Sequence, residues 1–252
     1  MSIARVLIIA GSDSGGGAGI QADIKAVTGL GGFAMTAIAA LTAQNTLGVT
    51  GVLPVPVDFV LAQMDAVIAD LGVDVVKIGM IGGPDIVHAV ADRLDDMPDV
   101  PVVFDPVMIA TSGSVLADDA TIAAFGRLIR RATLVTPNLP ELEALGGEAV
   151  VRGQARGLLI KGGHAEGEVI TDRLIDADGT EHIWQGSRIT TNADHGTGCT
   201  LASAIATGLG RGMSLPDAVA QARDYVRAAL SCAPGLGQGR GPMGFPLTPF
   251  RV

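Results

Sequence analysis

Short aliphatic runs, each closed by Gly, Pro, Asp or Asn, recur along this 252-residue chain and limit its fold more than any other feature. Runs of this kind, without polar alternation, are typical of strands buried on both faces of a parallel sheet. Segments with helical periodicity lie between them, so the pattern predicts βαβ units and a doubly wound α/β fold. The predicted strands are 6–10, 75–78, 102–104, 134–136 and 158–160, and the predicted helices are 18–30, 58–71, 85–94, 118–130, 198–209 and 215–232.

One segment departs from this alternation. Asp178 and Gly179 separate two alternating runs, 173–176 and 181–184, which predicts a β-hairpin. The apolar run 34–43 is assigned to neither a strand nor a helix. The chain length fits one large α/β domain, 1–252.

Composition excludes several classes of protein. Seventeen Lys and Arg against 26 Asp and Glu give a net charge of -9, and no basic cluster stands out, so a nucleic-acid partner is not expected. Apolar runs fall short of about 18 uninterrupted residues, which argues against a spanning helix. The two cysteines are too few for a disulfide scaffold and predict a cytoplasmic protein.

A glycine-rich loop, 11–19, follows the first predicted strand and opens the first predicted helix. Backbone N–H groups at such a place can bind an anion or a polar ligand. It is not a P-loop, because Ile20 follows the last glycine where that motif has Lys. Two alternatives remain open: a dinucleotide site, since Gly17, Gly19 and Ala22 match GxGxxA, and a loop that serves turn geometry alone.

Two polar residues, Asp23 and Gln44, lie at the edges of apolar segments. A Gln amide can donate and accept side by side, which suits a heterocycle whose ring nitrogen lies beside an amino group. Taken singly, each residue is more typical of an ordinary cap or a surface position.

Polar residues also follow three of the predicted strands. Asp105 follows 102–104, Asn138 and Glu141 follow 134–136, and Lys161 follows 158–160. The carboxyl ends of parallel strands share one crevice, where carboxylate and amide oxygens suit Mg²⁺ on a nucleotide and a Lys suits a phosphate. The alternatives are a capping box for Asn138 and Glu141 and a solvated Lys161.

The run His195-Gly196-Thr197-Gly198-Cys199-Thr200 precedes an Ala-rich helix. Consecutive small residues expose backbone amides at a helix N-terminus, which predicts an anion hole for a transferring phosphoryl group. The pKa of Cys199 is expected to be lowered there, unless this Cys is simply a small apolar residue. The four histidines show no zinc-binding spacing.

Seven motifs together resemble the hydroxymethylpyrimidine and phosphomethylpyrimidine kinases of thiamine biosynthesis, in the ribokinase-like superfamily. In order along the chain they are AGSDSGGGAGIQAD (10–23), LTAQNT (41–46), KIGM (77–80), DPVM (105–108), TPNLPE (136–141), KGGH (161–164) and HGTGCT (195–200). The resemblance implies a single three-layer α/β/α sandwich with a mostly parallel central sheet, and a homodimer. It also implies that Mg-ATP phosphorylates 4-amino-5-hydroxymethyl-2-methylpyrimidine and then its monophosphate.

The resemblance also implies a role for particular residues. Its pyrimidine pocket corresponds to Gly11, Asp23, Gln44, Met80 and Val107, closed by Ala18 and Gly19. Its Mg-nucleotide site corresponds to Asp105, Asn138 and Glu141, with Lys161 and Thr197 at the phosphates. Gly196, Thr197 and Gly198 resemble its anion hole, and Cys199 stands where related sugar kinases have an aspartate base.

Two positions depart from the family pattern. Only 19 residues separate Glu141 from Lys161, which predicts a truncated or remodelled helix there. Thr111 stands where a Lys is usual, which bears on the second phosphorylation because that substrate is anionic. Pyridoxal kinase of the same superfamily and a non-enzymatic pyrimidine-binding module are the alternative functions.

Overall fold

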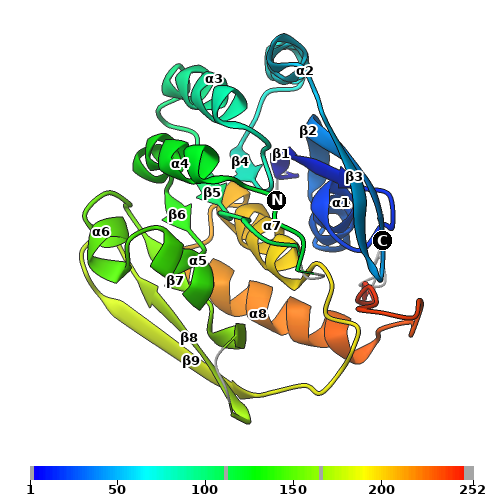
Figure 1. Cartoon of the computed structure of the whole chain (residues 1–252). Helices are drawn as coiled ribbons and strands as arrows, with labels where there is room; N and C mark the ends of the chain where they lie inside the picture. The colour runs from blue at the N-terminus through cyan, green and yellow to red at the C-terminus, as the bar shows by residue number, and fades with distance from the viewer. Residues whose placement is uncertain (1–2, 111–112, 165–166, 247–252) are drawn as a thin grey trace.

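One nine-stranded sheet runs through the molecule in the computed structural model, which describes residues 3–110, 113–164 and 167–246 (Figure 1). The strands are β1 (Arg5–Asp13), β2 (Phe33–Asn45), β3 (Gly48–Pro54), β4 (Val75–Ile78), β5 (Val102–Phe104), β6 (Leu134–Val135), β7 (Leu158–Ile160), β8 (Val169–Ile175) and β9 (Glu181–Ser187). Their order is β3-β2-β1-β4-β5-β6-β7-β8-β9. The six strands from β2 to β7 in this order run parallel, and antiparallel pairing is confined to the two ends.

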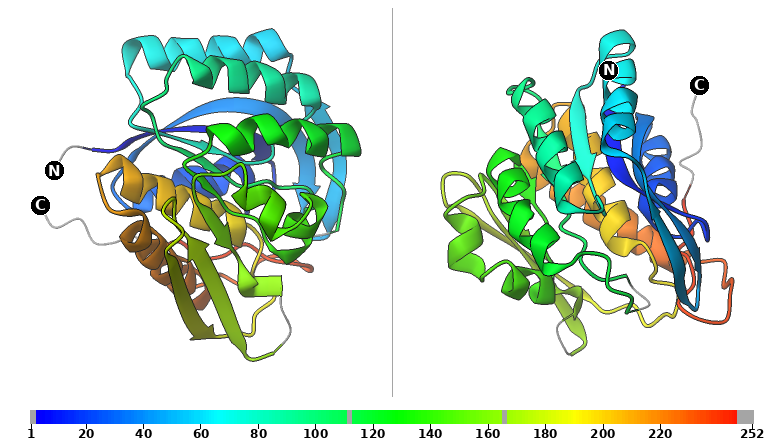
Figure 2. Two further views of the ribbon diagram at one scale, coloured as in Figure 1. Left: turned by 90° about the vertical axis from the view of Figure 1, so that its left-hand side faces the viewer. Right: turned by 45° about the horizontal axis from the view of Figure 1, so that its top comes forward.

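Helices cover both faces of the sheet, which gives three layers (Figure 2). One face packs against α1 (Gly19–Gly29), α7 (Thr197–Gly210) and α8 (Leu215–Ser231). The other packs against α2 (Val57–Asp70), α3 (Pro84–Asp95), α4 (Asp119–Arg131), α5 (Leu139–Ala144) and α6 (Glu148–Arg152). Since β4, β5 and β7 are buried along their whole length, their sequences are aliphatic almost throughout.

The predicted elements all form, with ends that differ by a few residues at most except in β1, β8 and β9, which are longer than predicted. The hairpin predicted around Asp178 and Gly179 is the β8–β9 pair. The unassigned run 34–43 belongs to β2, and β3 pairs with it as an antiparallel edge strand. The short segment before Lys161 holds two short helices, α5 and α6.

The carboxyl ends of the parallel strands place the candidate residues at one edge of the sheet. Asp105 follows β5, Asn138 lies just beyond β6, and Lys161 follows β7 and forms an isolated bridge with Asn138. The sheet order reverses beside β1, whose neighbours are β2 and β4, and ligands of open α/β sheets bind in the crevice at such a point. No described helix is long and apolar enough to cross a membrane.

Candidate active site

Asp105 and Lys161 form an ion pair at the centre of this edge. The Lys161 Nζ lies 2.6 Å from the Asp105 Oδ1, and the Thr136 hydroxyl donates to the same oxygen at 3.0 Å. Burial alone would lower the pKa of Lys161, but the carboxylates of Asp105 and Glu141 outweigh it and raise that pKa. Lys161 is therefore a permanent cation at the strand ends, rather than a solvated side chain.

Asn138 and Glu141 form the capping box of α5. The Asn138 Oδ1 accepts from the Glu141 N at 2.8 Å, and the Glu141 Oε2 accepts from the Asn138 N at 2.8 Å. Glu141 also reaches the ion pair, because its Oε2 lies 3.7 Å from the Lys161 Nζ. Burial, together with the nearby Asp105 carboxylate, raises the pKa of Glu141. The capping interpretation is confirmed, and the same carboxylate is available to the site.

The N-terminus of α7 points into the same place. Gly196 caps it with a φ of 88°, and a Cβ there would overlap the carbonyl oxygen of Gly17, so only glycine fits. A Cβ on Gly198 would lie 3.3 Å from the Asp105 Oδ2 and 3.4 Å from the Lys161 Nζ. The first N–H groups of a helix have no intrahelical acceptor. The anion hole predicted at 196–198 thus adjoins the Asp105–Lys161 pair.

Cys199 lies in the first turn of α7, but the expected lowering of its pKa is wrong. Burial raises the pKa of the thiol to about 11, and the Asp23 and Asp105 carboxylates act in the same direction. Lys77 opposes them without overcoming them. The helix terminus alone suggested a thiolate, whereas the surrounding carboxylates and the loss of water favour the neutral thiol.

Asp23 belongs to a buried ion pair. Both of its carboxylate oxygens lie 2.8 Å from the Lys77 Nζ, and the Ser203 hydroxyl donates to one of them at 2.7 Å. Neither the Asp23 nor the Lys77 side chain has any exposed surface. Burial raises the pKa of Asp23 and alone would lower that of Lys77, but each charge favours the other, and the Asp23 carboxylate raises the pKa of Lys77. The Asp23 carboxylate is thus saturated by protein groups and does not open to the crevice.

Gln44 lies beside His195 in a network that fixes the orientation of its amide. The His195 Nε2 is 2.9 Å from the Asp13 Oδ2 and 3.2 Å from the Gln44 Nε2. On the other side of the amide, the Thr42 Oγ1 is 3.0 Å from the Gln44 Oε1 and 3.1 Å from the Ser12 O. The one hydroxyl proton of Thr42 cannot serve two acceptors, and the His195 N–H that donates to Asp13 is no acceptor for an NH₂ group. Turning the Gln44 amide by 180° lets its NH₂ group donate to the Thr42 hydroxyl, while its oxygen and the Asp13 carboxylate share the one N–H of the His195 Nε2. One N–H and one oxygen lone pair of Gln44 then remain for a ligand.

The other residues predicted for the pyrimidine pocket lie along the same edge. Gly11 is near the end of β1, and its N–H donates to the Met80 carbonyl at 2.8 Å. Val107 directly follows the turn after Asp105, and both Met80 and Val107 are half-buried. Ala18 is the N-cap of α1 and Gly19 is its first residue, at the end of the glycine-rich loop.

Asp13 organises the glycine-rich loop, which the sequence did not predict. Its carboxylate accepts from the backbone N–H groups of Gly15, Gly17 and Ala18 at 2.7 to 3.0 Å, as well as from His195. Burial alone would raise the pKa of Asp13, but these hydrogen bonds lower it. The loop is therefore held against the start of α7. An acidic residue between an aliphatic strand and a run of glycines was the available signal.

Lys77 is the second residue that the sequence analysis missed. It is the one charged residue of β4, all four of whose residues are buried. A charge in such a strand requires a buried partner of opposite charge, which was the signal for the pair with Asp23.

The donor set at this edge fits a nucleotide-borne Mg²⁺. The described residues hold no group of three or more His, Cys, Asp or Glu side chains that could bind a metal unaided. Mg²⁺ in nucleotide sites needs only one or two carboxylates, because phosphates and waters supply the other oxygens. Asp105 and Glu141 present such carboxylates, at 2.6 and 3.7 Å from the Lys161 Nζ.

Comparisons with known proteins identify the family of this chain. The family model described as phosphomethylpyrimidine kinase matches residues 13–244. A hydroxymethylpyrimidine/phosphomethylpyrimidine kinase from Rhizobium meliloti is 48% identical over 257 residues, covering 95% of this chain and 96% of that protein. One from Bacillus subtilis is 44% identical, covering 96% and 94% respectively.

Solved structures share the fold. The ADP complex of Bacillus subtilis pyridoxal kinase superposes with a TM-score of 0.89 at 30% identity, covering 98% of each chain. Phosphomethylpyrimidine kinase from Clostridium difficile superposes with a TM-score of 0.78 at 34% identity, covering 90% of this chain and 99% of that one. The fold is thus ribokinase-like, and on the family match and these identities the chain belongs to the phosphomethylpyrimidine kinase family.

Proposed function

We propose that this protein uses ATP to phosphorylate 4-amino-5-hydroxymethyl-2-methylpyrimidine and then the monophosphate, as a step of thiamine biosynthesis. The observation that carries the proposal is the contact between the N-terminus of α7 and the Asp105–Lys161 pair at the carboxyl edge of the sheet. A cation, backbone amides and two carboxylates within reach of each other meet the needs of phosphoryl transfer, which depends on positioning and charge stabilisation. The names of the family and of the relatives above support the choice of substrate.

The residues of the edge divide into two sides. Gln44, with its free N–H and lone pair, holds the aminopyrimidine beside Gly11, Met80 and Val107, while Ala18 and Gly19 close over it. Asp23 acts through Lys77, whose charge it neutralises beneath the pocket.

Lys161 and the amides of Gly196, Thr197 and Gly198 hold the nucleotide phosphates on the other side. Asp105, Glu141 and Asn138 hold Mg²⁺ or its waters. The ion, when bound, neutralises charge on the transferring group.

The reaction joins the hydroxyl oxygen of the pyrimidine to the γ-phosphorus and breaks the bond from that phosphorus to the bridging oxygen of ADP. Cys199 lies in the first turn of α7, beside the position of the transferring group, and takes the proton of the hydroxyl. Loose phosphoryl transfer needs little assistance from a base, so a small thiolate fraction suffices.

A coupled assay for ADP release tests the proposal, with the pyrimidine alcohol, its monophosphate and pyridoxine in parallel. We expect turnover with the first two and a much lower kcat/KM with pyridoxine. Pyridoxal kinase is the second candidate, because a pyridoxal kinase shares the fold at a TM-score of 0.89. A preference for pyridoxine would establish that function, and no ADP release with any of the three would leave a binding module. Thr111, which bears on the second phosphorylation, lies outside the described residues.

Replacing Gln44 with leucine should raise the KM for the pyrimidine by about 5- to 150-fold, since an unmatched buried polar contact costs about 1 to 3 kcal/mol. The KM for ATP should stay unchanged. Steady-state kinetics with each substrate varied in turn measures both. Gln185→Leu, on the exposed face of β9, is the matched control. A changed KM for ATP with an unchanged KM for the pyrimidine would show that Gln44 lies on the nucleotide side of the site, and would contradict the proposed pocket.

Glu141→Gln separates the metal from the helix cap, because glutamine can keep the capping box while losing the charge. We expect an unchanged melting temperature, a higher Mg²⁺ requirement and lower turnover. Since burial raises the pKa of Glu141, the wild type should protonate this group earlier than an ordinary Glu as pH falls, and lose Mg²⁺ activation, a pH dependence that the variant lacks. Magnesium titrations at several pH values measure this, with Glu143→Gln on the exposed side of α5 as control. Full turnover at low Mg²⁺ in Glu141→Gln would show that Glu141 only caps α5 and does not bind Mg²⁺.

The protein forms a homodimer in this proposal, through the edge of the sheet at β3. Leu41 and Leu53 lie opposite each other on β2 and β3 and are 43% and 64% exposed, and Phe59 on α2 is 60% exposed. Apolar side chains on an open edge strand are unfavourable in water and are covered by a second copy. Sedimentation equilibrium should give a dimer, and Leu53→Asp should give a monomer. A monomeric wild type would contradict this surface as the interface.

The protein is cytoplasmic in this proposal. Both cysteines are free, as a reducing compartment such as the cytoplasm would keep them.

A further inference from the structure

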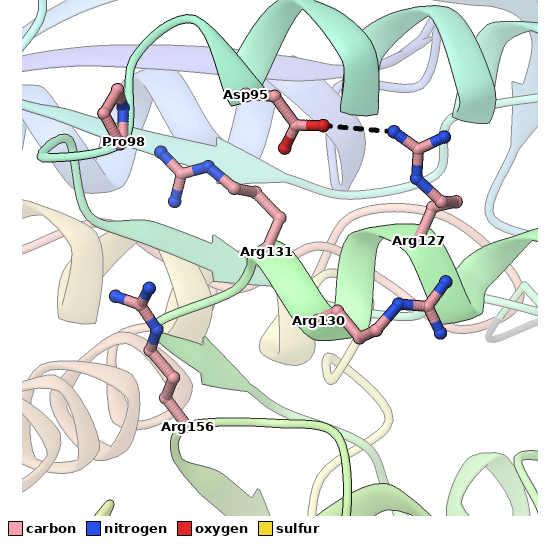
Figure 3. Close-up of a pocket in the computed structure, with 6 residues that line it drawn as sticks. All are labelled: Asp95, Pro98, Arg127, Arg130, Arg131 and Arg156. Atoms are coloured by element: carbon pink, nitrogen blue, oxygen red, sulfur yellow. Dashed lines mark hydrogen bonds and ion pairs between the residues drawn. The ribbon is translucent and has the colours of Figure 1, made fainter.

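A second polar hollow lies at the opposite edge of the sheet from the active site. It has a volume of about 340 Å³ and is lined by Asp95, Pro98, Arg127, Arg130, Arg131 and Arg156 (Figure 3). These residues come from the end of α3 and the loop after it, the last turns of α4 and the loop before β7. Because those segments lead into β5, β6 and β7, the hollow lies at the amino ends of the strands, whereas the kinase site lies at their carboxyl ends.

The charge of this hollow opposes that of the whole protein. Four arginines and one aspartate line it, while the chain as a whole carries a net charge of -9. Two of the arginines have structural partners. Arg127 bridges to Asp92 and Asp95, and Arg131 donates to the carbonyls of Leu94, Met97 and Val100.

The other two arginines are not neutralised by these contacts. Arg130 is exposed, and its NH1 donates to the neutral amide of Gln154 at 3.1 Å. Arg156 is exposed and forms no ion pair with any described residue, and Figure 3 shows its guanidinium directed toward that of Arg131. Burial lowers the pKa of Arg131, and the positive charge of Arg156 lowers it further, which shows that the two cations repel. An anion between them would remove that repulsion.

We propose that this hollow binds a compact phosphate or diphosphate group, free or as the ester of a small molecule. Guanidinium groups bind phosphate oxygens through paired N–H donors, and several of them around one concavity are typical of phosphate recognition. The volume is at the lower end of small-molecule pockets. No aromatic side chain lines it, so a nucleobase would find no surface to stack on, which favours a small ester over a nucleotide.

Binding of inorganic pyrophosphate tests the proposal, measured by calorimetry with the kinase site first saturated with a non-hydrolysable ATP analogue and the pyrimidine. We expect a remaining binding event of one pyrophosphate per chain that weakens as salt is added. Arg130→Gln/Arg156→Gln should weaken it at least tenfold. Both side chains are exposed, so the variant should fold, and its kcat and KM without pyrophosphate should match those of the wild type.

Arg211→Gln is the matched control, since it removes the same charge from an exposed arginine at the end of α7, outside the hollow. It should bind pyrophosphate like the wild type. The proposal would be overturned if the wild type with a saturated kinase site bound no pyrophosphate, or if the double variant bound it as tightly as the wild type. Two further titrations identify the source of the anion. Tighter binding of the pyrimidine diphosphate than of pyrophosphate assigns the site to the enzyme's own product, and the reverse order assigns it to the free anion.

Discussion

Cys199→Ala lowers the rate of phosphoryl transfer by about 10² to 10⁴, the usual loss on removal of a general base, while the fold and both KM values stay close to those of the wild type. The physical reason is that the acceptor proton loses its nearest recipient, while the anion hole and Lys161 remain. Single-turnover kinetics isolates this step from product release. Cys232→Ala, which changes an exposed thiol, is the control and should behave like the wild type.

The pH dependence identifies the thiol as the source of that loss. Since burial raises the pKa of Cys199 to about 11, the protein holds a neutral thiol near neutral pH. The thiolate fraction then grows about tenfold for each unit between about pH 7 and pH 9. The wild-type rate should rise with it, and the rate of Cys199→Ala should not. Near-normal turnover in Cys199→Ala would reduce this residue to packing and leave the amides, Lys161 and the metal as the catalytic groups.

Lys77→Met destabilises the folded protein by about 3 to 5 kcal/mol, because it leaves the Asp23 carboxyl group buried without its partner. The Ser203 hydroxyl is one neutral donor and cannot replace two contacts of 2.8 Å from an ammonium group. Urea denaturation followed by circular dichroism gives the free energy of unfolding.

A second variant distinguishes the charge from the packing. Lys77→Met/Asp23→Leu removes both charges together and should recover most of the lost stability, since an apolar pair of similar volume is often no less stable than a buried ion pair. Arg93→Met breaks the exposed pair with Asp65 and should cost less than about 1 kcal/mol. A loss in Lys77→Met as small as that of Arg93→Met would show that the Asp23–Lys77 pair is not held as an ion pair.

The sequence determined the architecture, because each local pattern agreed with the fold. Strands such as 75–78 and 102–104 are apolar at every position but Lys77, which is typical of burial on both faces. Glycine, proline and aspartate marked the element ends, and parallel topology then placed Asp105 and Lys161 at one edge. The sequence did not reveal β3, whose exposed side chains lack the pattern of a buried strand.

The tertiary structure decided the state of each functional group. Asp23 and Gln44 both appeared as polar residues at the edges of apolar segments. In the structure Asp23 is paired with Lys77, whereas Gln44 keeps an N–H and a lone pair for a ligand. Cys199 shows the same limit: its place at a helix N-terminus is local, whereas its raised pKa comes from burial and from Asp23 and Asp105, which are far away along the chain. A sequence fixes which groups are present and roughly where strands and helices carry them. The protonation and pairing of those groups depend on water and charges within a few ångströms, which only the folded chain brings together.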